Sequence, residues 1–229
     1  MPGRHSIKLP FANRVRAGRL LGEALRAHAQ RRDVVVLALP RGGVPVAFEI
    51  AEAIDAPRDL MLVRKLGMPG HAELAMGAIA FGGVKVMNPD VVEAGSISEA
   101  AIEAVVRRER AELDWRQRAY RGDRPAPRVE GRCVMLVDDG LATGATMRAA
   151  IQAVRFQQPE RIVVAVPVAP PDTVAVLRGE AEEVVCLATP DPFMAIGCWY
   201  EDFPQTSDDE VKALLARAWE KENAATSRA

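Results

Sequence analysis

The sequence has few cysteines and no long apolar run. It contains three cysteines, Cys133, Cys186 and Cys198, which are widely spaced and lie outside any CxxC or Cys/His cluster. This pattern predicts neither a disulfide framework nor a structural zinc site. No stretch approaches the roughly 18 apolar residues of a membrane span, and the first ten residues lack the apolar core of a signal peptide. We therefore expect a cytoplasmic protein without a membrane partner.

The sequence also lacks an excess of either charge. Thirty basic and 31 acidic side chains leave a formal net charge of -1, which predicts no nucleic acid partner. Hydrophobic residues make up 49% of the chain and charged residues 27%, as in ordinary packed proteins. At this length we expect one domain over residues 1–229, and any anion site must be local.

Short apolar runs recur along the chain and alternate with helical patterns. The runs cover residues 34–39, 60–63, 133–137, 162–166 and 184–187. Buried strands that alternate with helices predict an α/β fold with a central, mostly parallel sheet. Ligands of such sheets bind beyond the carboxyl ends of the strands, so we expect the functional site in the loops that follow these runs.

Two segments depart from this alternation. Ser96 and Glu99 form a capping-box pattern, which predicts a long helical insertion over about 96–121. Its arginines alternate with acidic residues, which favours a solvent-exposed helical face over a nucleic-acid patch. Ser207 and Glu210 form a second capping-box pattern, which predicts a closing helix.

The sharpest motif follows the apolar run 133–137. Asp138 and Asp139 come directly after the predicted strand, and Gly140 permits the chain to turn there. Adjacent carboxylates suit the vicinal hydroxyls of a sugar. Residues 142–146 then enter a helix and offer backbone N–H groups at the positive end of its dipole, which makes a phosphate cradle. The motif is neither a Walker A loop nor a dinucleotide fingerprint, whose glycines precede the acidic residue.

This motif resembles the 5-phosphoribosyl-1-pyrophosphate (PRPP) signature of type I phosphoribosyltransferases. The resemblance implies that family's fold, with a small hood contributed by about 188–205. It also implies that Asp138 and Asp139 bind the ribose hydroxyls and serve in catalysis. The residues implied to complete the ribose and 5-phosphate site are Gly140, Leu141, Ala142, Thr143, Gly144, Ala145 and Thr146. Members that act on 6-oxopurines have a proton-transferring aspartate at the position of Ala142, so that role is not carried over.

Two further loops follow predicted strands at the same edge. Arg41, Gly42 and Gly43 offer a guanidinium group and a close backbone approach, although a Gly-Gly turn is commonly only a turn. Its place resembles the family's pyrophosphate loop, in which an unusual peptide bond is often seen, and the Arg41–Gly42 pair would accommodate it. Arg64 and Lys65 stand where the family carries cations. The resemblance therefore implies that all five residues bind pyrophosphate, with Arg41 and Lys65 catalytic.

The acceptor side of the site is less sharply marked. Residues 71–83 have no strong periodicity and several glycines, which suits a mobile lid in which Glu73 could contact a base. Residues 191–203 are aromatic-rich in a protein with 5% aromatic residues, which indicates either a base-binding hood or a small satellite core. In the hood interpretation the base-binding residues are Ile196, Trp199 and Asp202.

The resemblance implies an enzyme of nucleotide metabolism that transfers the 5-phosphoribosyl group from PRPP to a nitrogenous base, purine-like in expectation, and releases pyrophosphate. Mg²⁺ would arrive with the polyphosphate. Related enzymes are often dimers, which implies a homodimer, although no interface is identifiable in the sequence. A non-catalytic sensor of PRPP or nucleotides would carry the same loops. A nucleotide-binding methyltransferase also places acids at a strand end, but its glycine-rich loop is missing. The acceptor base stays open.

Overall fold

A five-stranded parallel sheet forms the centre of the computed structural model, which describes residues 8–80 and 82–226. The strands run in the order β2–β1–β6–β7–β8, and every neighbouring pair is parallel. Their bounds are β1 (Val34–Ala38), β2 (Arg58–Leu60), β6 (Cys133–Val137), β7 (Arg161–Val168) and β8 (Glu183–Ala188). Every residue of β1 and β6 is buried, as expected for apolar runs covered on both faces. The predicted parallel sheet is confirmed.

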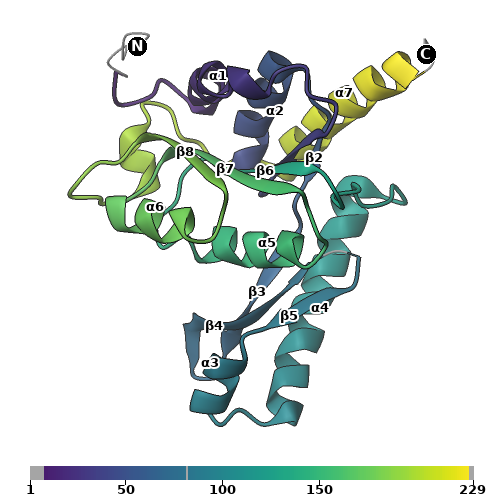
Figure 1. Ribbon diagram of the computed structural model, residues 1–229, viewed down its shortest axis with the longest axis vertical. Coiled ribbons are helices and arrows are strands. Elements are labelled where there is room, and N and C mark those ends of the chain that lie inside the picture. The colour runs from purple at the N-terminus through teal and green to yellow at the C-terminus, as the bar shows by residue number, and fades with distance from the viewer. Residues whose placement is uncertain (1–7, 81, 227–229) are drawn as a thin grey trace.

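Helices cover both faces of this sheet (Figure 1). One face carries α1 (Arg14–Ala24), α2 (Gly43–Ile54) and α7 (Asp208–Thr226), and the other carries α5 (Ala145–Arg155) and α6 (Pro171–Arg178). Along β1, Val34 and Val36 join one core cluster while Val35 and Leu37 join the other, which is the alternation that strand geometry requires. Two short 3-10 helices complete this part, η1 (Arg26–His28) and η2 (Ile196–Trp199). Among the described helices, none combines the length and the apolar composition that crossing a membrane requires.

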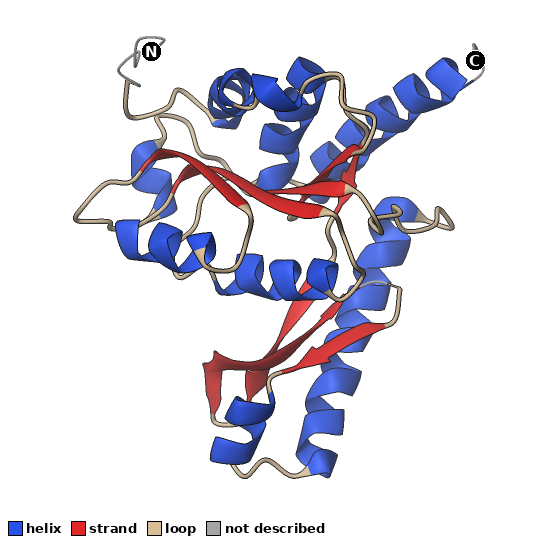
Figure 2. Ribbon diagram, in the orientation of Figure 1, coloured by secondary structure: helices blue, strands red, loops and turns tan. Residues whose placement is uncertain are grey.

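A second sheet lies beyond α5 (Figure 2). It is antiparallel, with the strand order β3 (Val63–Met68), β4 (His71–Ala80) and β5 (Val84–Met87). The helix α5 packs between the two sheets, and the long helix α4 (Glu99–Arg121) runs along the second one after the short helix α3 (Pro89–Ala94). This arrangement places α4 against β3, the strand that carries Arg64 and Lys65.

The irregular conformation expected over 71–83 is wrong for the described residues of that stretch, and the lid role stays a prediction. Residues 71–80 form β4, which pairs with β3 and β5. The strand is rich in alanine, and its pairing with β3 is irregular near Gly67 of that strand. Small residues with weak strand propensity hide the period-2 pattern, so the strand could not be recognised.

Two further boundaries differ from the sequence predictions. The strand expected at 60–63 lies at Arg58–Leu60, because ion pairs allow Arg58 and Asp59 to be buried there. Helix α4 is capped by Ser98, whose Oγ accepts from the N–H group of Ala101 at 3.3 Å, and not by Ser96. The cap at Ser207 is confirmed, since its Oγ accepts from the N–H group of Glu210 at 3.1 Å.

Candidate active site

The loop that contains Arg41, Gly42 and Gly43, called the first loop below, meets the acidic motif Asp138–Asp139 at the carboxyl edge of the parallel sheet. The two meet there because β1 pairs directly with β6. A Cβ atom added to Gly42 would lie 2.0 Å from Oδ2 of Asp139, and one added to Gly43 would lie 2.9 Å from Cα of Asp138. Only glycine permits backbone to approach the carboxylates this closely. The non-proline cis peptide of this loop joins Pro40 to Arg41, one bond before the Arg41–Gly42 bond expected from the resemblance.

The two carboxylates have different surroundings. Asp139 is buried and forms an ion pair with Arg14, whose Nε lies 2.7 Å from its Oδ2. Asp138 is half-buried, and its Oδ1 accepts from the N–H group of Asp139 at 2.9 Å. Burial, together with the negative charge of Asp139, raises the pKa of Asp138 well above its ordinary value. Asp138 therefore takes up a proton readily, whereas the charge of Asp139 is balanced by Arg14.

Arg14 also connects the acidic motif to the hood. Its Nη1 donates to the carbonyl oxygen of Pro204 at 2.6 Å, and its guanidinium carbon lies 3.8 Å from the ring centroid of Phe203. The hydroxyl of Tyr200 donates to the backbone oxygen of Asp139 at 2.5 Å. Sequence reasoning missed Arg14, because an arginine at the start of a helix is ordinary and its partner is 125 residues away.

The loop after the carboxylates is held by contacts to neighbouring elements. A Cβ atom on Gly140 would lie 2.6 Å from Cγ2 of Ile196, so the hood packs directly on this glycine. The N–H group of Leu141 donates to the carbonyl oxygen of Val168 at 2.9 Å. This hydrogen bond fastens the loop to β7, and a contact of Leu141 with PRPP stays a prediction.

The remainder of the loop is open at the start of α5. Ala142, Thr143 and Thr146 are exposed, and Gly144 has a φ of 70° as the N-cap residue of the helix. The Oγ1 atom of Thr173 donates to the carbonyl oxygen of Ala142 at 2.7 Å. This hydrogen bond fixes the loop from the side of α6 and leaves its hydroxyl groups and the helix terminus toward a ligand.

Two cavities bring the predicted phosphate-binding segments together. One of about 170 Å³ is lined by Pro40, Arg64 and Thr146, which come from the first loop, β3 and α5. A larger one of about 490 Å³ is lined by Arg64, Lys65 and Thr146. In contrast, Nη1 of Arg41 lies 3.5 Å from Oδ1 of Asp208 at the start of α7. The segments expected to bind phosphates thus meet, although Arg41 turns toward α7.

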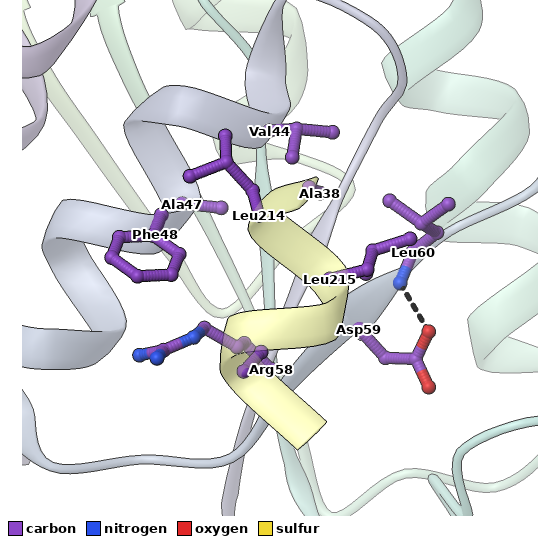
Figure 3. Close-up of a pocket in the computed structure, with 10 residues that line it drawn as sticks. Ala38, Val44, Ala47, Phe48, Arg58, Asp59, Leu60, Leu214 and Leu215 are labelled. Carbon is purple, nitrogen blue, oxygen red and sulfur yellow. Dashed lines mark hydrogen bonds between the residues drawn. The ribbon is translucent and has the colours of Figure 1, made fainter. Parts of the chain in front are cut away.

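A different hollow lies between α2, α7 and β2 (Figure 3). Apolar side chains such as Val44, Phe48 and Leu215 surround it, and Arg58 and Asp59 stand at its side. Its volume is about 20 Å³, which is room for no more than a water molecule. It is a packing gap beneath α7 and not a substrate site.

The aromatic segment is a small core of its own. Trp199 stacks on Phe193 at a centroid separation of 6.3 Å, and Tyr200 stacks on Phe203 at 4.7 Å. The N-terminal segment joins it, because the N–H group of Phe11 donates to the carbonyl oxygen of Trp199 at 2.8 Å. The hood therefore includes residues before α1 in addition to the expected stretch 188–205.

The residues predicted to bind the base lie in different surroundings. Ile196 packs within this core, whereas Asp202 is exposed. Glu73 lies in β4, and its side chain falls outside the described residues. Base binding by these residues and by Trp199 stays a prediction.

Comparisons with known proteins agree with this geometry. The family model of the phosphoribosyl transferase domain matches residues 13–200. "Putative phosphoribosyl transferase Rv0571c" of Mycobacterium tuberculosis strain H37Rv is 50% identical over 208 residues, which cover 91% of this chain and 47% of the relative. The chain thus spans about half the length of that curated relative.

A solved structure is similar over nearly its whole length. The crystal structure of TT1426 from Thermus thermophilus superposes with a TM-score of 0.83 at 43% identity. The match covers 90% of this chain and 98% of that one. With the family model and the curated relative, this match shows that the chain belongs to the phosphoribosyl transferase family.

Proposed function

We propose that the protein transfers the 5-phosphoribosyl group of PRPP to a nitrogenous base, purine-like in expectation, and releases pyrophosphate. One observation carries the proposal: the carboxylates at the end of β6 lie against the glycines of the first loop and lead directly into the open start of α5. A sugar with phosphates on both of its ends needs acceptors for hydroxyl groups between two anion sites. The three segments meet that requirement at one edge of the sheet.

In the proposed reaction, a nitrogen atom of the base attacks C1 of the ribose. The bond from C1 to the pyrophosphate oxygen breaks, its electron pair leaves with pyrophosphate, and the base gives up a proton to water or to the leaving pyrophosphate. Asp138 and Asp139 accept hydrogen bonds from the ribose hydroxyls, and Arg14 holds the carboxylate of Asp139 in place. Arg64 and Lys65 stabilise the charge that grows on the leaving group, and Arg41 joins them when its side chain leaves Asp208.

Mg²⁺ fits this site as an ion carried by the substrate. It usually keeps several waters and binds through one or two carboxylates plus phosphates. The half-buried carboxylate of Asp138 can supply one oxygen, and the described residues hold no group of three or more potential metal ligands. When bound, the ion would neutralise charge on the pyrophosphate.

Isothermal titration with PRPP and Mg²⁺ tests the proposal, followed by a panel of bases assayed for pyrophosphate release. We expect binding by the wild type, and release with one class of base. The double variant Asp138→Asn/Asp139→Asn should lose both. Normal binding and turnover by that variant would contradict the proposal.

The regulatory alternative gives a different pattern in the same assays. A sensor of PRPP or nucleotides would bind PRPP through the same loops. It would not release pyrophosphate, whichever base is added. The ion pair between Asp139 and Arg14, which joins the ligand edge to the hood, would suit such a protein as well. Binding without release would place this alternative first.

A further inference from the structure

Helix α4 supplies one wall of the larger cavity and brings a carboxylate between two arginines. Oε2 of Glu109 lies 2.8 Å from Nε and 2.7 Å from Nη2 of Arg64 on β3. Its Oε1 lies 3.0 Å from Nε and 2.9 Å from Nη2 of Arg108. Each guanidinium thus contacts its own oxygen of one carboxylate.

The charges of this group leave it cationic. Burial alone would raise the pKa of Glu109, but the hydrogen bonds from Arg64 and Arg108 outweigh it and lower the pKa. One carboxylate between two guanidinium groups gives a net charge of about +1. Glu109 uses the Nε and Nη2 edge of each arginine, and each guanidinium has further N–H groups that can donate elsewhere.

The position of Arg108 is unusual for a helix-surface ion pair. Arg107 and Arg116 pair with glutamates four positions away, as neighbours on a helix face do. Arg108 instead pairs with the adjacent Glu109, and side chains at adjacent positions do not face each other on a helix. Its side chain therefore bends toward the cavity wall, while 71% of it stays exposed.

The cavity has the size and the chemistry of a ligand site. Its volume of about 490 Å³ falls in the usual range for small-molecule pockets, roughly 300 to 1,000 Å³. Arg64, Arg108 and Glu109 line one part, and Thr146 of the predicted 5-phosphate loop lines another. Two arginines oriented by one carboxylate present a planar set of donors that matches the oxygens of a phosphate or carboxylate.

We propose that Arg64 and Arg108, oriented by Glu109, form an oxyanion-binding site that extends the phosphoribosyl site along α4. Its natural ligand rests on the proposed function and has two possible sources, the leaving pyrophosphate of PRPP or an acidic group on the acceptor. In both cases Arg108 is a binding residue contributed by a helix that lies outside the predicted loops. Glu109 is a positioning residue.

Titration calorimetry with inorganic pyrophosphate, and separately with PRPP, tests this site in the full chain. The variants are Arg108→Gln, Arg108→Lys and the matched control Arg110→Gln, which removes the same charge from an exposed position of α4 outside the cavity lining. Because charge-assisted hydrogen bonds are lost, Arg108→Gln should bind pyrophosphate about tenfold more weakly or worse. Arg108→Lys should recover part of that loss, since it keeps the charge without the planar fork. The control should stay within about twofold.

The outcomes separate the site from the proposed function. Equal affinities in Arg108→Gln and Arg110→Gln, or a wild type that binds no pyrophosphate, would overturn the oxyanion site. A wild type that binds pyrophosphate through Arg108 but does not bind PRPP would support the site and reject the proposed function. If PRPP also binds more weakly to Arg108→Gln, the ligand is the leaving group. If Arg108→Gln binds free pyrophosphate more weakly but binds PRPP as the wild type does, the site serves an acidic group of the acceptor.

Discussion

At the end of β6, Asp138 and Asp139 are neighbours in the sequence and differ in what balances their charge. Asp139 faces Arg14, while Asp138 faces the negative charge of Asp139 from a half-buried position. A carboxylate without its own cation costs stability unless it is protonated. The arrangement is therefore strained electrostatically until a sugar supplies hydroxyl donors to Asp138.

The variant Asp138→Asn should make the protein more stable near neutral pH while it weakens PRPP binding. Because the folded-state pKa of Asp138 is raised, its ionisation disfavours the folded state, and wild-type stability falls as pH rises from the unfolded pKa through the folded one. The variant lacks this loss, so we expect its free energy of unfolding to be about 1 kcal/mol higher, as for other substitutions that remove a destabilising residue from a functional site. Chemical denaturation at several pH values measures it.

The pH series carries its own control. Below the unfolded-state pKa of Asp138, near 3.8, its carboxyl group is neutral in both the folded and the unfolded state. The wild type and Asp138→Asn should therefore differ little in stability there. PRPP affinity of the wild type should rise with pH over the same window, beyond any rise seen in the variant. A stability difference that does not depend on pH would contradict the argument.

Replacing Arg14 should affect both stability and the site. Arg14→Gln leaves Asp139 buried without its cation, and side-chain exposures of 11% and 12% place this pair among the buried ones. Removal of one partner of such a pair costs about 3 kcal/mol, which lowers the melting temperature by roughly 10 °C in a chain of this length. Thermal unfolding followed by circular dichroism measures this.

The exposed Arg16 on the same helix is the matched control, and Arg16→Gln should unfold close to the wild type. Arg14→Lys keeps the charge and should recover part of the stability, but it cannot reach Asp139 and Pro204 with one planar group. Equal melting temperatures for Arg14→Gln and Arg16→Gln would show that Asp139 has no need of Arg14.

At the scale of elements, the contact between the hood and the acidic loop depends on Gly140. A Cβ atom there would lie 2.6 Å from Cγ2 of Ile196 and 3.1 Å from Cγ1 of Val168. In Gly140→Ala either η2 or the loop must move, so we expect PRPP affinity to fall about tenfold with helix content unchanged. Calorimetry and circular dichroism measure the two quantities.

Gly179→Ala provides the comparison for this loop. Gly179 lies at the end of α6, and its added Cβ would meet no atom closer than 3.4 Å. That variant should bind PRPP as the wild type does. If Gly140→Ala binds PRPP equally well, the hood is not part of the binding geometry.

The parts of the site that the sequence predicts are those contiguous with a strand. Asp138 to Thr146 and Arg41 to Gly43 follow β6 and β1 directly, so a buried run and a small-residue loop place them at one edge. Contacts made across the chain leave no such pattern. The pairing of Arg14 with Asp139 and that of Arg64 with Glu109 join residues far apart, and either arginine alone resembles a surface cation.

At the scale of the whole molecule, the parallel sheet is predictable because its strands are continuous apolar runs. The antiparallel sheet is not predictable, since β4 is built largely from small residues. In addition, β3 begins with Val63, which the sequence pattern places in the preceding strand as the last residue of the apolar run 60–63. Segments near both ends of the chain also pack against the rest of the fold. Phe11 pairs with Tyr200 in the hood, and α7 packs on α2 and β2.

The C-terminal helix links the parallel sheet to α4, and this yields a last prediction. Leu215, on the buried side of α7, is 3% exposed, and at the start of the same helix Asp208 accepts from the hydroxyl of Tyr120 at 2.6 Å. Leu215→Ala should cost about 3 kcal/mol, or roughly 10 °C in melting temperature, because it enlarges the gap already present there. Lys212→Ala, on an exposed turn of α7, should change little.

The shape of the unfolding transition decides how far this link extends. If α7 stabilises both sheets together, Leu215→Ala should lower a single transition seen equally by far-ultraviolet circular dichroism and by the fluorescence of Trp115, Trp199 and Trp219, which lie on α4, η2 and α7. A fluorescence change that precedes the loss of secondary structure would mean that α7 detaches first. In that case Asp208 would release Arg41 and Tyr120 while the sheet that carries Asp138 stays folded, and the C-terminal helix would be an independent unit beside the site.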